Sequence, residues 1–113
     1  MTGVLIGVPC EIVPIHDVTE IFAGDAFALP ARTVVLAWQI VLDAAVTSMT
    51  GLLQGSIDGT NWTTLDTSTS TTGGVRTVTA PTACMFVRFN LTAVAENTAL
   101  FITVTLVAKV AIP

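Results

Sequence analysis

From Thr33 onward, apolar side chains recur at every second position, which is the period of a β-strand and not that of a helix. The stretch 33–43 has one face formed by Val34, Leu36, Trp38, Ile40 and Leu42. The stretches 85–91 and 100–110 repeat this alternation, and the region from Thr33 onward is rich in Thr and other β-branched residues, which pack well on a pleated sheet. The pattern predicts an all-β domain.

The stretch 85–91 separates its two faces more clearly than the others. Its inward face is predicted to carry Met85, Val87, Phe89 and Leu91. The opposite face carries Phe86, Arg88 and Asn90, so this side of the strand is expected to be either exposed to solvent or part of an interface.

Turn residues divide the rest of this region into short strands. The sequence Asp58-Gly59-Thr60-Asn61 predicts a tight hairpin turn between two strands, because Gly and Asn adopt positive φ at little cost. The polar stretch 66–74 is predicted to be a surface loop. About six strands after Thr33 and two before it, at this spacing, are typical of a two-sheet antiparallel β-sandwich or jelly roll.

The first thirty residues differ from the rest. Pro9, Pro14 and Pro30 each lack a backbone donor, and half of the acidic residues of the chain lie here. We therefore expect an extended N-terminal arm over residues 1–30 and a β-sandwich domain over residues 31–113. Short apolar pieces in the arm are suited to adding edge strands or to lying along a neighbouring subunit.

Composition excludes several classes of partner. Hydrophobic residues make up 52% of the 113 residues and charged residues 11%, which indicates a surface that meets other protein. The net charge of −4, with four Lys and Arg residues, argues against nucleic acid as a partner. The longest apolar runs fall short of the about 18 residues that a membrane-spanning helix needs, so no membrane partner is expected.

Residues for catalysis or metal binding are sparse. His16 is the one histidine, and no nucleophile elbow, phosphate-binding loop or metal-ligand spacing accompanies it. We expect no enzyme activity, no metal and no cofactor. Cys10 and Cys84 are interpreted as two buried thiols, with a disulfide between them as the alternative.

The segment 53–65, with the sequence LQGSIDGTNWTTL, is followed later by FVRFNL at 86–91. Together they resemble a recurrent pattern of β-sandwich proteins in tailed-bacteriophage particles: a G-S-x-D-G-x-N-W hairpin, an R-F-V-R-like strand and a closing strand rich in Thr and Val. The hairpin is also similar to that of discoidin-like, carbohydrate-binding sandwiches. The resemblance covers the last two-thirds of the chain and does not extend to the segment before Pro30.

This resemblance implies a virion structural protein, most simply a capsid decoration or cement protein. Such a protein forms a homo-oligomer, commonly a trimer, and binds to major capsid proteins on the capsid exterior. From the arm, the residues expected to contact the capsid or a neighbour are Val4, Leu5, Ile6, Ile12, Ile15, Ile21, Phe22 and Phe27. On the outward faces of the strands, the expected subunit contacts are Val35, Val41, Phe86 and Phe101.

Two alternatives remain open at the level of the sequence. One is a carbohydrate-binding module with Asp58, Asn61 and Trp62 at the ligand, since an aromatic ring packs on the apolar C–H groups of a sugar. The other is a tail or connector subunit, which would share the fold class. Each of the expected contact residues can equally be an ordinary core residue.

Overall fold

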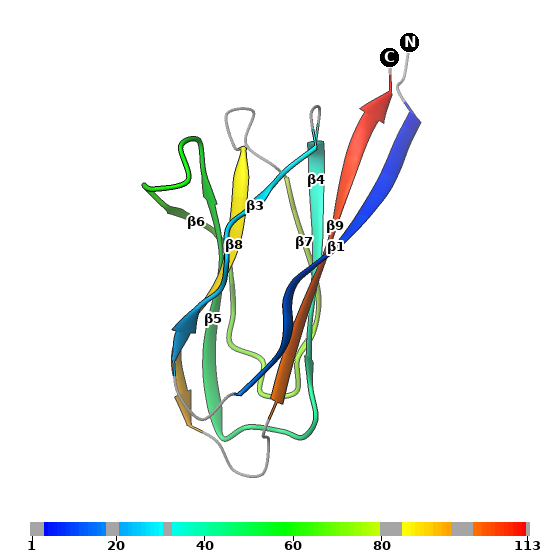
Figure 1. The fold of residues 1–113 in the computed structure, drawn as a ribbon. Helices are drawn as coiled ribbons and strands as arrows, with labels where there is room; N and C mark the ends of the chain where they lie inside the picture. Colours follow the sequence, from blue (N-terminus) through cyan, green and yellow to red (C-terminus); the bar gives the residue numbers. More distant parts are fainter. Residues whose placement is uncertain (1–3, 18–20, 31–32, 80–84, 96–100, 113) are drawn as a thin grey trace.

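The computed structural model of the chain describes residues 4–17, 21–30, 33–79, 85–95 and 101–112. Figure 1 shows these residues as two facing sheets of strands. The described part contains no helix that is long and apolar enough to cross a membrane. Its strands are β1 (Val4–Asp17), β2 (Phe22–Ala23), β3 (Phe27–Ala28), β4 (Thr33–Leu42), β5 (Ser48–Ser56), β6 (Thr63–Ser68), β7 (Gly74–Thr79), β8 (Phe86–Ala95) and β9 (Phe101–Ile112).

Sheet 1 has the strand order β1-β9-β4-β7, and sheet 2 has the order β2-β8-β5-β6, with β3 also paired to β8. Every pairing is antiparallel. The chain passes back and forth between the two sheets, and the first strand lies beside the last. This is the order of a jelly roll, so the predicted all-β, two-sheet antiparallel sandwich is confirmed.

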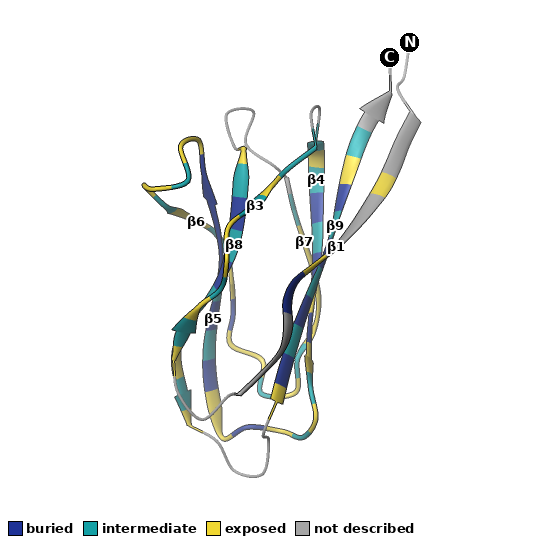
Figure 2. Cartoon of the chain, in the orientation of Figure 1, coloured by how far each residue is buried: buried dark blue, intermediate teal, exposed yellow. Residues whose placement is uncertain are grey.

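The core lies between the sheets and follows the predicted alternation. Figure 2 shows buried residues alternating with less buried ones along β4 and β9. Trp38 on β4, Phe89 on β8 and Leu106 on β9 are each at most 1% exposed. The same cluster contains Leu36, Ile40, Leu53, Val87, Leu91, Ile102, Val104 and Ala108.

Phe89 occupies the middle of this core and constrains its neighbours. Its ring lies 5.9 Å from that of Phe22 and 6.1 Å from that of Trp38, in tilted arrangements that aromatic pairs prefer. Gly51 on β5 faces the ring, and a Cβ atom there would stand 2.8 Å from Cε1 of Phe89. The absence of a side chain at residue 51 therefore makes room for the phenylalanine.

The N-terminal segment is paired into both sheets, where β1 and β2 are edge strands. β1 pairs with β9 from Val4–Ile112 to Asp17–Phe101, and β2 and β3 pair with β8. Edge strands tolerate proline because one side of the strand has no ladder partner. The N-terminal end of β1 and the C-terminal end of β9 extend beyond the other strands in Figure 1.

Two local expectations need correction. Met85 was expected to point inward, but it is 59% exposed and precedes β8, with its backbone bonded to Ser56 and Leu29. The loop expected over 66–74 is shorter, since β6 continues to Ser68 and β7 begins at Gly74. In both places the end of a strand is set by backbone contacts with residues far away in the sequence. The local alternation of side chains does not encode such contacts.

Candidate functional site

The predicted hairpin joins β5 to β6 and is held by its own side chains. Ser56 Oγ accepts hydrogen bonds from the backbone N–H of Asp58 (3.2 Å) and of Gly59 (2.9 Å). Gly59 has a φ of 76°, in the left-handed region that favours glycine. The hairpin turn predicted from the sequence is confirmed, with residues 57–62 joining the two strands.

The Asp58 carboxylate is engaged in this turn. Its Oδ1 accepts from the backbone N–H of Thr60 and of Asn61, each at 2.8 Å, and its Oδ2 accepts from Nδ2 of Asn61 at 2.8 Å. The bonds to the backbone of Asn61 and Thr60, followed by the side-chain bonds, hold the pKa of Asp58 well below its usual range. The structure thus gives Asp58 and Asn61 a role in forming the turn and leaves them little capacity for a ligand.

Trp62 belongs to a different cluster, on the outer face of sheet 2. The guanidinium carbon of Arg88 on β8 lies 4.5 Å from the centre of the Trp62 ring, a cation–π arrangement. Arg88 Nε donates to Oε1 of Gln54 on β5 at 2.9 Å, and Asn90 Nδ2 approaches the same oxygen at 3.4 Å. We call these four residues, Gln54, Trp62, Arg88 and Asn90, the Trp62–Arg88 cluster.

Sequence reasoning identified only Trp62 in this cluster as a candidate. The outward positions of Arg88 and Asn90 were predicted, yet their partner Gln54 lies 34 residues away from Arg88 in the chain. Gln54 and Arg88 are register partners across β5 and β8, so the pairing of the strands brings them together. The signal available in the sequence was the alternation of 85–91 combined with the hairpin.

A second candidate surface is the outer face of sheet 1. Val41 and Phe101, 47% and 45% exposed, lie near each other because Val41 pairs with Thr103, two residues from Phe101. Val75 on β7 is 65% exposed on the same face. Val35 is half-buried there, so this face carries three of the four expected subunit contacts.

The centre of this face is uncharged. It contains a hollow lined by Ala37, Trp38, Gln39, Val75, Thr105 and Val107. Among the described residues, Glu11 on β1 and Lys109 on β9 are charged and lie on this face, and Asp43 lies at its edge, where its carboxylate accepts a hydrogen bond from the backbone N–H of Phe101. We call this surface the sheet 1 face.

The expected contacts from the N-terminal segment lie in different environments. Ile12 is 1% exposed in the core and is unavailable to a partner, because β1 turns it toward the opposite sheet; its assignment as a contact is corrected. Phe22 and Phe27 are half-buried against the core, and Ile21 is 60% exposed. The side chains of Val4, Leu5, Ile6 and Ile15 lie outside the described residues, although their backbone belongs to β1.

The remaining candidates are placed as follows. Phe86 is half-buried on the outer face of sheet 2, under the hairpin, with its ring 3.9 Å from where a Cβ of Gly59 would stand. Cys84 lies outside the described residues, so the pairing of Cys10 is untested. Within the described ranges, no three His, Cys, Asp or Glu residues come together as a metal site.

The fold of this chain is similar to that of solved structures, including the following two. The chain matches the SPBc2 prophage-derived protein YomS with a TM-score of 0.69 at 12% identity, over 96% of this chain and 97% of that one. It matches the K1 cleaved adhesin domain of Lys-gingipain from Porphyromonas gingivalis W83 with a TM-score of 0.55 at 18% identity, over 95% and 75%. No protein-family model matches the chain, and no curated protein sequence does. These likenesses show the fold.

Proposed function

We propose that this chain is a structural protein of a tailed-phage virion, and specifically a capsid decoration or cement protein. It would bind to major capsid proteins on the outside of the head as a homo-oligomer, most simply a trimer. The likeness in fold to a prophage-derived protein supports a phage origin. Jelly rolls also recur in viral capsid domains, although a fold by itself does not define a function.

The observation that carries the proposal is the sheet 1 face. Val41, Val75 and Phe101 are exposed on it, and its centre is uncharged. Depletion of charge together with exposed apolar side chains is typical of the buried centre of protein interfaces. A cement protein acts by adding such interface area between capsid subunits, without any chemical step.

The test combines the mass of the protein in solution with its binding to shells. Light scattering at neutral pH gives the oligomeric state, and co-sedimentation measures binding to empty shells assembled from the major capsid protein of the same phage. We expect a discrete oligomer that binds the shells and raises their melting temperature. A stable monomer that leaves the shells unchanged would overturn the proposal.

A tail or connector subunit would use the same fold in a different ring. Co-sedimentation with purified tail tubes and connector rings of the same phage distinguishes this case. Binding to those rings, with no binding to shells, would reassign the chain to the tail or the neck and exclude the cement role.

A further inference from the structure

Arg88 is held in one position before any ligand arrives. Its Nε donates to Gln54 Oε1 at 2.9 Å, and its guanidinium lies 4.5 Å from the centre of the Trp62 ring. Gln54 is itself only 9% exposed, so the acceptor is fixed by the sheet. A ligand that binds Arg88 would therefore lose little free energy to ordering this long, flexible side chain, because the side chain is already ordered in the folded protein.

The charge of Arg88 has no counter-ion among the residues that the structure describes. The other arginine described, Arg76, is bound by two nitrogens to the Asp66 carboxylate, at 2.8 Å and 3.0 Å. Arg88 forms no ion pair within the described ranges, and only its Nε has a hydrogen-bond partner there. A planar guanidinium with its terminal N–H groups open matches a carboxylate through two parallel hydrogen bonds.

The neighbours of Arg88 fit a sugar better than a protein surface. Trp62 is half-buried beside the guanidinium and supplies an aromatic ring, and Asn90 supplies an amide for hydroxyl groups. A few precisely placed polar groups beside an aromatic ring are typical of small-ligand sites. A stable protein interface, by contrast, needs about 20 to 30 residues on each side.

We propose that the Trp62–Arg88 cluster binds a saccharide that carries a carboxylate, such as a uronic acid unit. Arg88, which covers one face of the Trp62 ring, would pair with the carboxylate, and the other face of the ring would pack on a neighbouring sugar unit. The cluster lies on the outer face of sheet 2, and the sheet 1 face lies on the other side of the core. Both surfaces can therefore be occupied at once, so this binding does not depend on the proposed cement role.

The test uses tetragalacturonic acid and its fully methyl-esterified form, which differ only in the charge of the carboxylates. Binding is followed by NMR at the indole N–H signals of Trp62 and Trp38, the latter serving as an internal reference because it is buried in the core. We expect the acid to shift the Trp62 signal and the ester to bind about tenfold more weakly or worse. Equal binding of acid and ester would overturn recognition of the carboxylate.

Two variants separate the role of Arg88 from that of overall charge. Arg88→Gln should weaken binding of the acid about tenfold or more. Lys109→Gln removes one positive charge from the opposite face and should leave binding unchanged. Thermal melting of each variant shows whether it is folded, and unaltered binding by folded Arg88→Gln would overturn the proposal.

Acetate and a hexaglutamate peptide, at matched carboxylate concentration, test other sources of the same charge. We expect neither to shift the Trp62 signal as far as the oligosaccharide does. Saturable binding of the peptide with no response to the oligosaccharide would identify an acidic protein partner and overturn the saccharide. The absence of binding to any of the probes would likewise overturn the proposal.

Discussion

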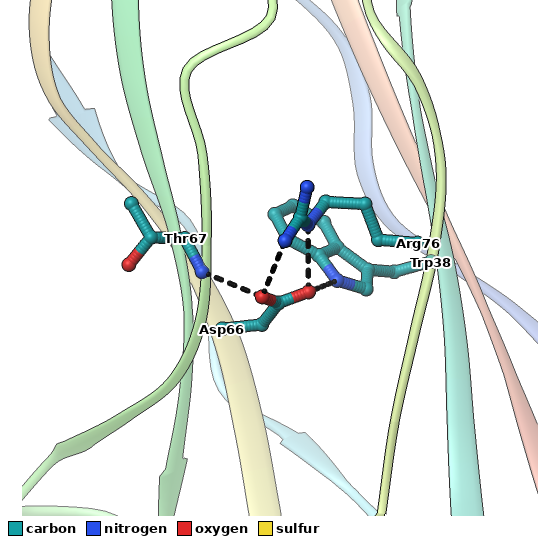
Figure 3. A network of polar contacts seen from close by, with 4 residues as sticks. All are labelled: Trp38, Asp66, Thr67 and Arg76. Atoms are coloured by element: carbon teal, nitrogen blue, oxygen red, sulfur yellow. Dashed lines mark hydrogen bonds and ion pairs between the residues drawn. The ribbon is translucent and has the colours of Figure 1, made fainter.

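The indole N–H of Trp38 in sheet 1 donates a hydrogen bond of 2.9 Å to Oδ2 of Asp66 in sheet 2 (Figure 3). Arg76 on β7 binds both oxygens of the same carboxylate, and the backbone N–H of Thr67 donates to Oδ1. Trp38 and Arg76 are register partners on neighbouring strands of sheet 1. One carboxylate on the edge strand β6 therefore ties sheet 2 to two strands of sheet 1.

Replacing Asp66 should destabilise the protein more than replacing Arg76. Asp66→Ala leaves the buried Trp38 N–H without its acceptor, and we expect a loss of about 2–3 kcal/mol in the free energy of unfolding. Arg76→Gln removes a partner whose side chain is 47% exposed and screened by solvent, so its loss should be clearly smaller. Urea denaturation of the two variants measures the difference. Equal losses would show that the Trp38 bond contributes little.

The same contacts make stability depend on pH. The hydrogen bond from Arg76 is the largest of the effects that hold the pKa of Asp66 below 3.8, its value in the unfolded chain. The unfolded state therefore binds a proton first, so the stabilisation is complete above pH 3.8 and is lost as the pH falls through the lower folded pKa. Urea denaturation at several values from pH 6 to pH 2 should show the difference between wild type and Asp66→Asn shrinking toward acid.

A matched control for this pH dependence is Asp25→Asn, which removes an exposed carboxylate elsewhere. This variant measures the effect of removing a carboxylate in general, and only the additional change seen in Asp66→Asn is assigned to the contacts of Asp66. A constant difference between wild type and Asp66→Asn across this range would contradict the assigned role of the carboxylate.

The sequence predicts the two-sheet sandwich, but it does not predict that the first strand pairs with the last. Alternation in β4 and β9 predicts which side chains face the core, because a strand has only two faces. The pairing of β1 with β9 joins the two ends of the chain, and no local pattern encodes it. The prolines of the N-terminal segment suggested an arm because they interrupt a ladder, yet an edge strand accepts them.

For polar side chains, too, the sequence predicts contacts between near neighbours in the chain but not contacts between distant strands. Asp58 was placed correctly in a turn because its partners lie within three residues. Asp66 also looked like a loop residue, but its partners Trp38 and Arg76 are 28 and 10 residues away. Arg88 was expected on an outward face, while its contact with Trp62 depends on how the hairpin folds over sheet 2. Long-range contacts of this kind follow from strand order.

Two glycines with similar backbone angles should tolerate alanine to different degrees. Gly73 has a φ of 82° and Gly59 a φ of 76°, so both substitutions are strained by about 1 kcal/mol. A Cβ at Gly73 would also collide with the carbonyl oxygen of Ile40, whereas one at Gly59 would meet nothing closer than 3.9 Å. Thermal and urea unfolding should show Gly73→Ala losing about 3 kcal/mol or more and Gly59→Ala about 1 kcal/mol. Equal losses would remove the steric argument.

The contact between Gly51 and Phe89 predicts compensation between two core substitutions. Gly51→Ala would place a methyl group 2.8 Å from Cε1 of Phe89 and should cost about 2 kcal/mol. Phe89→Leu removes that part of the ring, so the double variant should be more stable than the sum of the single losses by about 1 kcal/mol. Urea denaturation of all four proteins completes the cycle, and additive losses would show that the clash is relieved in another way.

A charge on the sheet 1 face should disrupt assembly without disrupting the fold. Val75 is 65% exposed on this face, and Ile57, in the hairpin of sheet 2, is 62% exposed. Val75→Asp should lower the mass measured by light scattering and weaken shell binding about tenfold or more, because an unpaired carboxylate would be buried in the interface. Ile57→Asp is the matched control and should keep both properties. Assembly retained by a folded Val75→Asp, or lost equally in Ile57→Asp, would place the interface elsewhere on the molecule.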